Sequence, residues 1–532
     1  MKQLRIRILT IVVISAAILG ALLYMDRKAQ AMREKATLQM SAEELDTLAG
    51  VRFFLPADEN RGLPCDLQAT LFDENELEQY LIVPMDLDAS HLVCYAKDAF
   101  GNYLNRYEID FSATDTYAVG FRNLILRRTH LPVLSITLDE RSPSLADLVA
   151  SDKSVQCYGN LTLSVDRDLA HDRHWIDEIH SRDASKNVLG SVTLRGRGNT
   201  SWDFCDKKSF SIDFEKANYL LGLGKNRKWN LIGNAMDKTL LNNEVFLQMS
   251  SDLGVAYEPH CEQVTLYIDG EYQGVYLLTT KVNVDRDRIA LREGDFLLNW
   301  GGTDEEQPLY YSCPAWENAK GDYRAMFADL VWPKEDTEQG KADKQALLQE
   351  FIDVVTDPSD ERFTEIIDLD SLVAYYWAQE ISMNYDADFR STYFYYKADA
   401  GKFYMGPVWD LDLSLGWIAD KFGAFFDEPQ GWKLRRMSWY EGLFEREEFR
   451  DAVRDAYLNG GVREAMFSAL ERFEKRIGEM EEDGDLDYRR WRADWPDLGI
   501  RYGDSYEAQA AGRLQFFADR VAWIDAQMMQ EE

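Results

Sequence analysis

The sequence predicts an α+β protein with an apolar N-terminal segment, a small β-sandwich and a larger C-terminal region. Three observations support this prediction. An uncharged run covers Ile8–Met25, short alternating runs between turn residues fill much of residues 51–300, and charged segments with helical spacing follow Trp439. With 532 residues, of which 46% are hydrophobic, the chain is long enough for roughly two to four packed domains.

Residues 1–30 are predicted to form a cytoplasmic tip and a transmembrane anchor. Lys2, Arg5 and Arg7 precede the uncharged run, which as a helix with a rise of about 1.5 Å per residue reaches roughly 27 Å, near the thickness of a hydrocarbon core. The positive charges favour an N-terminus inside the cell and an extracytoplasmic, cell-surface location for the remainder. Ala29-Gln30-Ala31 fits a small-x-small cleavage site, so secretion after signal cleavage is the alternative.

Residues 31–50 are polar and favour helix, so they are expected to form a stalk. Residues 51–130 are predicted to form an accessory β-sandwich, because the short runs VRFFLP, CDLQATLF, HLVCYAKD and TYAVGF alternate with turn signals such as KDAFGN. This domain has no recognisable catalytic cluster. We therefore expect a spacing or binding role for it.

Charge and cysteine content restrict the partners. The net charge of −34 argues against a nucleic-acid backbone as partner and leaves cations and basic substrates open. None of the six cysteines forms a CxxC pair, which disfavours a zinc or redox motif. Cys65 and Cys94 both lie in strand-like runs and are the best candidates for a disulfide in an exported chain. Buried free thiols are the interpretation for the other four cysteines, which the sequence cannot pair.

Residues 131–300 are predicted to form a sheet with one helix. Alternating runs around Val192 and Phe210–Phe214 flank the glycine-rich turn Arg195–Asn199. Glycines let a backbone approach phosphates, and a lysine on the returning strand, Lys207 or Lys208, would neutralise them. A plain hairpin turn is the alternative interpretation. Farther along, an Asp-Gly pair at residues 269–270 between alternating runs predicts a two-residue hairpin.

The helix of this region is expected from about Asp237 to Leu253, with Asp237 as N-cap and Gly254 as the C-terminal stop. Its apolar positions recur every four residues and predict a buried face: Leu241, Val245 and Met249. Glu244 on this helix either pairs with the lysine of the glycine-rich hairpin or is a surface acid.

Residues 301–532 contain an aromatic hairpin that brings two acids together. The runs STYFYYK and KFYMGPVW flank a glycine-containing turn and predict two antiparallel strands. With the turn near Ala400, Asp410 lies opposite about Arg390, so Asp386 lies at the same end of the hairpin. Two neighbouring carboxylates can hold a divalent metal and accept a proton, the tasks that phosphoryl transfer requires of protein acids.

The C-terminal part from Trp439 is expected to be helical. Apolar positions at helical spacing mark core faces there, among them Leu514, Phe517, Val521 and Ile524.

Seven short blocks follow one another along the chain: RGRGNTSW, KKSF, LLGL, WNLIGN, DKTLL, LYIDGEYQGVYLL and GPVWDLDLSLG. In this order they resemble the CotH kinase family, the atypical protein kinases similar to spore coat protein H. The resemblance covers residues 131–532. It implies a divergent, two-lobed kinase-like fold, with residues 131–300 and 301–532 as the two lobes, that uses ATP and Mg²⁺ or Mn²⁺ to phosphorylate protein Ser or Thr hydroxyls.

The resemblance also implies roles for individual residues. Lys208 in KKSF matches the lysine that contacts the nucleotide phosphates. Asp386 in NYDADF matches the catalytic aspartate that orients or deprotonates the acceptor hydroxyl. Asp410 in VWDLD matches the metal-binding aspartate, and Asp412 is a second candidate for the metal. The predicted nucleotide site further includes the glycine-turn residues and the helix acid: Arg197, Gly198 and Glu244.

Two positions depart from the family pattern. Ser391 stands five residues after Asp386, where many members have an asparagine that could complete the metal coordination, and it is predicted to ligate the metal more weakly. Thr280 in LLTTKV replaces the acid of a TEK segment. Ser391 therefore bears on whether the protein is active.

The expected function is that of a cell-surface protein kinase. Its predicted partners are a protein substrate, Ser-rich or basic, and the membrane through the N-terminal helix, with no nucleic acid. Two alternatives remain open. One is a non-catalytic adhesion or scaffold protein, which suits the anchor, stalk and sandwich, and the other is transfer of AMP to protein hydroxyls.

Overall fold

The computed structural model describes most of the chain after residue 49. The described residues are 50–60, 62–72, 78–84, 92–109, 116–118, 124–165, 188–300, 316–317, 323–324, 328–387, 390–416, 428–436, 438–492 and 503–530. They divide into two compact units. One contains the described residues up to Thr137 with two short later segments, and the other contains most of the remainder.

The first unit is built from short strands. These are β1 (Arg52–Leu55), β2 (Leu67–Gln68), β3 (Thr70–Leu71), β4 (Gln79–Pro84), β5 (Leu92–Lys97), β6 (Tyr103–Ile109), β7 (Thr116–Ala118) and β8 (Leu124–Thr129). β1 pairs antiparallel with β2 and β5, and β5 with β6. A second sheet has the order β3-β4-β8-β7. Its β4 and β8 run parallel, which an antiparallel sandwich does not contain.

The predicted disulfide is wrong, because Cys65 and Cys94 are both free. The Cys65 Sγ lies 2.9 Å from the Ser135 Oγ, and Cys94 is fully buried. Burial raises the pKa of the Cys65 thiol to about 11 and that of the Cys94 thiol to about 12. Both are therefore free thiols, of which Cys94 is buried and Cys65 is partly buried. Cys313 lies outside the described residues.

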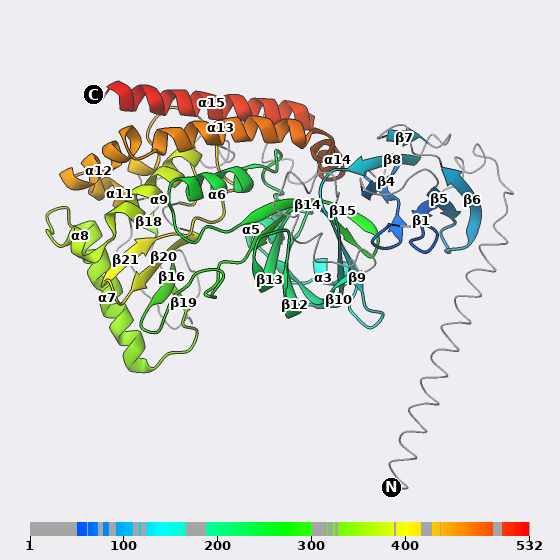
Figure 1. The fold of residues 1–532 in the computed structure, drawn as a ribbon, viewed down its shortest axis with the longest axis horizontal. Coiled ribbons are helices and arrows are strands. Elements are labelled where there is room, and N and C mark those ends of the chain that lie inside the picture. Colours follow the sequence, from blue (N-terminus) through cyan, green and yellow to red (C-terminus); the bar gives the residue numbers. More distant parts are fainter. Residues whose placement is uncertain are drawn as a thin grey trace, which may run out of the picture. The chain divides into compact units, whose positions relative to one another are not determined.

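Seven strands in the middle of the chain form a closed sheet, and Figure 1 shows their arrangement. Its strands include β9 (Val133–Leu138), β10 (Gln156–Ser164), β11 (Val188–Arg197), β12 (Ser209–Tyr219), β13 (Lys225–Ile232), β14 (Cys261–Ile268) and β15 (Glu271–Thr280). β13 pairs with β12 and also with β15, which closes the order β13-β12-β11-β10-β9-β14-β15. Alternate side chains such as Leu194, Ile212 and Trp229 are completely buried, as strand periodicity requires.

The predicted two-lobed kinase-like fold with a transmembrane anchor is therefore wrong. The chain has a β-rich fold built on the closed sheet. Alternating apolar residues predicted the individual strands, but the pairing of β13 with β15 joins residues about fifty positions apart, and local patterns do not encode such pairing.

The predicted membrane anchor and cell-surface location are not supported by the structure. Within the part of the chain that the structure describes, no helix has the length and apolar character needed to span a bilayer. The anchor and stalk predicted over residues 1–30 and 31–50 fall outside the described residues, apart from Gly50.

The second unit continues with a smaller sheet and most of the helices. The sheet has the order β19-β16-β20-β21, formed by β16 (Phe296–Trp300), β19 (Ala328–Trp332), β20 (Thr392–Lys397) and β21 (Lys402–Met405). The longer helices are α6 (Asn242–Asp252), α7 (Glu338–Thr356), α9 (Leu369–Ser382), α12 (Glu447–Leu458), α13 (Val462–Glu479), α14 (Glu481–Trp491) and α15 (Tyr506–Gln530). Shorter elements are α3 (Leu145–Val149), α5 (Thr200–Phe204), α8 (Phe363–Ile366), α11 (Ser438–Leu443), η3 (Leu434–Arg436), β17 (Trp316–Glu317) and β18 (Tyr323–Arg324).

The C-terminal helices form the predicted core. α13 packs against both α6 and α15, as Figure 1 shows. Phe517, Val521 and Ile524 of α15 are buried, and Leu514 is half-buried. Arg520 of α15 forms a completely buried ion pair with Glu380 of α9, whose carboxylate also accepts a hydrogen bond of 2.7 Å from the backbone nitrogen of Lys433. α15 therefore holds α9 in place.

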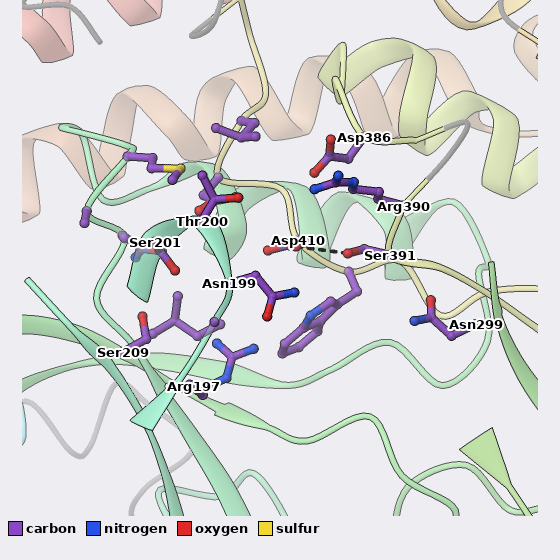
Figure 2. A pocket seen from close by; sticks show the side chains of 18 of the residues that line it. Arg197, Asn199, Thr200, Ser201, Ser209, Asn299, Asp386, Arg390, Ser391 and Asp410 are labelled. Carbon is purple, nitrogen blue, oxygen red and sulfur yellow. Dashed lines mark hydrogen bonds between the residues drawn. The ribbon is translucent and has the colours of Figure 1, made fainter. Parts of the chain in front are cut away.

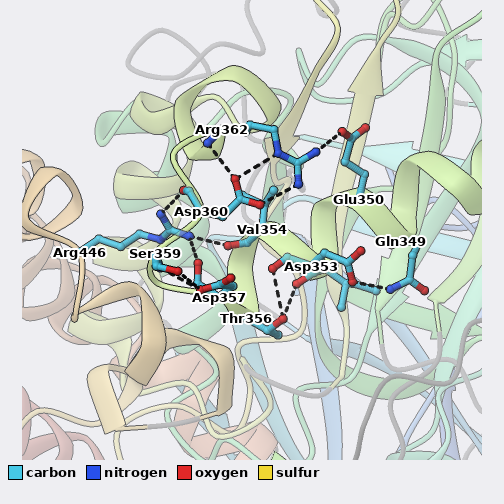
Figure 3. A network of polar contacts seen from close by, with 11 residues as sticks. Gln349, Glu350, Asp353, Val354, Thr356, Asp357, Ser359, Asp360, Arg362 and Arg446 are labelled. Carbon is cyan, nitrogen blue, oxygen red and sulfur yellow. Dashed lines mark hydrogen bonds and ion pairs between the residues drawn. The ribbon is translucent and has the colours of Figure 1, made fainter.

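A second polar network fixes the end of α7 (Figure 3). The guanidinium of Arg446, only 4% exposed, donates hydrogen bonds to the carbonyl oxygens of Val354, Asp357 and Asp360. These carbonyls include ones that a helix C-terminus leaves without intrahelical partners. Arg446 therefore caps α7 and joins it to the start of α12.

Candidate active site

A cavity of about 370 Å³ in the second unit is lined mostly by four segments (Figure 2). The segments are the glycine-rich turn at the end of β11, the end of β13 with the residues that follow it, the residues Asp386, Arg390, Ser391 and Tyr393, and the stretch from Trp409 to Leu413. Ser209, Asn299 and Asp329 complete the lining. Of the predicted site residues, the cavity is lined by Arg197, Gly198, Asp386, Ser391, Asp410 and Asp412.

Helix α9 places Asp386. Its N-terminus is capped by Asp368, and it ends at Met383, which has a left-handed backbone with φ of 54°. The buried Asn384 then donates from Nδ2 to Gln379 Oε1 at 3.0 Å and accepts from the backbone nitrogen of Asp386 at 3.2 Å. The amide of Asn384 thus ties Asp386 to the last turn of the helix.

The hairpin of β20 and β21 places Asp410, with a register that pairs Lys397 with Lys402, as the aromatic alternation predicted. Two buried side chains then hold the segment beyond β21. Glu258 Oε1 accepts the Val408 N–H at 2.7 Å, and Asn243 Oδ1 of α6 accepts the Leu411 N–H at 2.9 Å. Asp410 is therefore fixed from both sides along the chain.

Ser391 and Asp410 meet directly in the cavity. The Ser391 Oγ donates to Asp410 Oδ2 at 3.0 Å (Figure 2). Both residues have left-handed backbones, with φ of 52° for Ser391 and 65° for Asp410. Non-glycine residues pay about 1 kcal/mol or more for this conformation, and such strain concentrates at functional sites.

The cavity concentrates charge. The pKa of Asp412 is raised well above its ordinary value by burial and by the negative charges of Asp410 and Asp386, and Arg197 partly opposes the shift. Burial lowers the pKa of Arg197, while Asp410 and Asp412 favour its charged form. The Arg197 guanidinium lies 5.5 Å from the centroid of the Trp409 ring. Two arginines, Arg197 and Arg390, and four aspartates therefore line the cavity.

The donor set fits a hard divalent cation. Carboxylates from three aspartates and the hydroxyl of Ser391 supply only oxygen ligands, which Mg²⁺ and Mn²⁺ prefer. Among the described residues, no three His, Cys, Asp or Glu side chains converge as a complete metal cage. Mg²⁺ is commonly held by one or two carboxylates with water and substrate phosphates, so a complete protein cage is not required.

The glycine-rich turn forms one wall. A Cβ on Gly198, whose φ is 92°, would lie 2.4 Å from Ser201 Oγ, and a Cβ on Gly196 would lie 2.4 Å from the Trp202 ring. Both positions therefore require glycine. Lys153 Nζ donates to the Gly198 carbonyl at 2.8 Å and steadies the turn.

The three other predicted residues do not line the cavity. Lys207 forms a buried ion pair with Asp487 at 2.6 Å. Lys208 donates to the carbonyl of Trp202, and Glu244 pairs with Arg476 at 2.7 Å. The contact considered between Glu244 and a lysine of the hairpin is therefore not formed, and the assignment of Lys208 and Glu244 to the nucleotide stays a prediction.

Sequence reasoning did not single out several residues that line the cavity: Thr200, Ser201, Asn234, Asn299, Asp329 and Arg390. Arg390 lies only four positions after Asp386, and its backbone nitrogen donates to the Asp386 carbonyl at 2.9 Å. This short separation from Asp386 in the sequence could have indicated that Arg390 lines the same cavity. Asn299 and Asp329 come from β16 and β19, whose pairing joins distant parts of the chain.

Comparison with known proteins identifies the family. A family model described as CotH kinase protein matches residues 194–524, a span that contains every residue lining the cavity. No curated protein matches the chain. Because the matched span covers more than half of the 532 residues, the chain belongs to the CotH kinase protein family.

Proposed function

We propose that this protein transfers the γ-phosphoryl group of ATP to a hydroxyl of a protein substrate in the cavity of about 370 Å³. The observation that carries the proposal is the pairing of Ser391 with Asp410 in one cavity with Asp386 and Arg197. Family membership supports a kinase-like activity. Such a site needs one acid for the hydroxyl and oxygen ligands for a metal, and this cavity offers both.

In the proposed reaction, Asp386 accepts the proton of the acceptor hydroxyl. The acceptor oxygen forms a bond to the γ-phosphorus as the bond to the bridging oxygen of ADP breaks, and ADP leaves. The guanidinium of Arg197 stabilises negative charge on the phosphoryl oxygens. Asp410 and Asp412, with Ser391 beside them, would hold Mg²⁺ or Mn²⁺, which neutralises phosphate charge when bound.

The nucleotide has room beyond the phosphate site. A neighbouring cavity of about 980 Å³ shares three lining residues with the first: Asn299, Asp329 and Tyr393. Lys228 and Lys281 also line it. Because these cations suit an anionic ligand, we assign this cavity to the remainder of the nucleotide.

The acceptor is proposed to be a serine-rich or basic protein segment. The net charge of −34 supports this choice, because a cationic partner is attracted by an acidic protein and a polyanion is repelled.

Transfer of label from γ-labelled ATP to a Ser-rich basic peptide, with Mg²⁺ and with Mn²⁺, tests the proposal. We expect Asp386→Asn and Asp410→Ala to abolish transfer. Asp399→Ala, on the exposed turn of the same hairpin, is the control and should retain it. Absence of transfer by the wild-type protein with either metal would refute the kinase function and favour a binding protein. Transfer of label from α-labelled ATP would instead indicate AMP transfer.

A further inference from the structure

A second cavity of the same unit, with a volume of about 230 Å³, shares no lining residue with the candidate active site. Its walls come from the chain before β14, from Tyr257 to His260, and from the residues around the end of β15 and beyond it, from Thr280 to Val282 and from Asp287 to Ile289. It shares Lys281 and Val282 with the cavity assigned to the remainder of the nucleotide.

Arg288 lines this cavity with an unpaired guanidinium. Its Nε, Nη1 and Nη2 atoms are all buried, and none has a hydrogen-bond partner in the described structure. The guanidinium lies 4.6 Å from the centroid of the Trp229 ring, which is completely buried. Burial lowers the pKa of Arg288 to about 10, so the group remains charged at neutral pH. A buried cation without partners is costly and calls for an explanation.

The neighbouring groups leave this charge largely uncompensated. Burial lowers the pKa of His260 and raises that of Glu258 well above its ordinary value, so burial disfavours the charged form of both groups. Asp285 and Asp287 are the nearby acids, and they favour the charged guanidinium without hydrogen bonding to it. Glu258 also has one carboxyl oxygen, Oε2, without a hydrogen-bond partner among the described residues.

We propose that this cavity binds a small oxyanion, of which a phosphate group is the best match, through the guanidinium of Arg288. A guanidinium presents its donors in a planar fork that fits two oxygens of a phosphate or carboxylate. The cavity volume of about 230 Å³ admits inorganic phosphate or a small phosphorylated or carboxylated molecule. The proposal does not rest on the kinase function, because Arg288 lines neither the candidate active site nor the cavity assigned to the nucleotide.

The site lies beside a group that fixes the catalytic segment. Glu258 lines the same cavity, and its Oε1 accepts the Val408 N–H at 2.7 Å, two residues before Asp410. A bound oxyanion would therefore contact the wall that holds Asp410 in place.

Isothermal titration calorimetry with inorganic phosphate tests the proposal on the full chain. The parent protein should carry Arg197→Gln, which removes one of the two arginines of the candidate active site and so reduces phosphate binding there. In that background we expect saturable binding, and Arg288→Gln should weaken it at least about tenfold. Arg286→Gln, which removes an exposed arginine two positions away that does not line the cavity, is the matched control and should change binding less than about threefold.

Urea unfolding without phosphate separates a ligand site from a structural arginine. Because Arg288→Gln removes an unpaired buried cation, its unfolding midpoint should equal or exceed that of its parent. A lower midpoint would show that Arg288 is structural and would overturn the proposal. Unchanged phosphate affinity in Arg288→Gln, or no saturable binding by the parent up to about 10 mM phosphate, would overturn it too.

Discussion

Removal of the Ser391 hydroxyl should weaken metal-dependent activity. Its hydrogen bond of 3.0 Å orients the Asp410 carboxylate, and a hydrogen bond to a charged group is worth about 1.5–3 kcal/mol. At about 1.4 kcal/mol per factor of ten, its loss corresponds to roughly a 10-fold to 100-fold fall in kcat/KM or in metal affinity.

The backbone at this position supplies the comparison. Because Ser391 has a φ of 52°, Ser391→Ala loses the hydroxyl and keeps the strained conformation, whereas Ser391→Gly loses the hydroxyl in a residue that adopts this conformation freely. Both variants should show the same activity loss, and Ser391→Gly should be the more stable of the two. Ser391→Asn suits a left-handed backbone and adds an amide oxygen, so it should require less Mg²⁺ for half-maximal rate.

The assay is the initial rate of transfer from ATP as a function of Mg²⁺ and Mn²⁺ concentration, with urea unfolding of each variant in parallel. If Ser391→Gly retains the wild-type rate and the wild-type metal dependence, the hydroxyl does not position Asp410 and the reasoning fails.

Three further predictions concern the supports of the site. Gly198→Ala should lower the transfer rate and the stability more than Gly224→Ala does, because both glycines have φ of 92° but only a Cβ at position 198 would meet Ser201. Transfer rates and urea unfolding midpoints of the two variants test this, and equal effects would contradict it. Lys207→Met removes the ion-pair partner of the buried Asp487 carboxylate and should lower the free energy of unfolding in urea by about 3–5 kcal/mol. Lys208→Met should lower it by less than about 1–2 kcal/mol. Similar losses in the two variants would refute this prediction. The pKa of Glu258 is raised in the folded state, so its contribution to the free energy of unfolding is present below its ordinary pKa of 4.5 and is lost as pH rises. Glu258→Gln should therefore reduce the fall in the free energy of unfolding between pH 5 and 8. An unchanged slope of this free energy against pH would contradict the prediction.

Local patterns in the sequence predicted the elements that carry the site. Aromatic alternation around the glycine-containing turn predicted the hairpin that ends at Asp410, and the four-residue apolar spacing predicted the buried face of α6. An Asp-Gly pair predicted the turn between β14 and β15, where Asp269 and Gly270 both have positive φ. These features depend on neighbours in the chain, which a sequence displays directly.

Features that depend on distant partners were missed. Lys207 and Lys208 are adjacent and chemically alike, and nothing near them indicates that Lys207 pairs with Asp487, 280 positions away. Glu244 likewise finds its partner in Arg476, 232 positions away. Closure of the sheet through β13 and β15 depends on long-range pairing in the same way. The family resemblance supplied the roles of Asp386 and Asp410, and the fold supplied their common cavity.

The most direct test of the proposed phosphoryl transfer compares γ-labelled with α-labelled ATP as donors for the wild-type protein and for Asp386→Asn. We expect label on the protein acceptor from γ-labelled ATP only, and none from either donor with Asp386→Asn. Label from the α position, or undiminished transfer by Asp386→Asn, would contradict it.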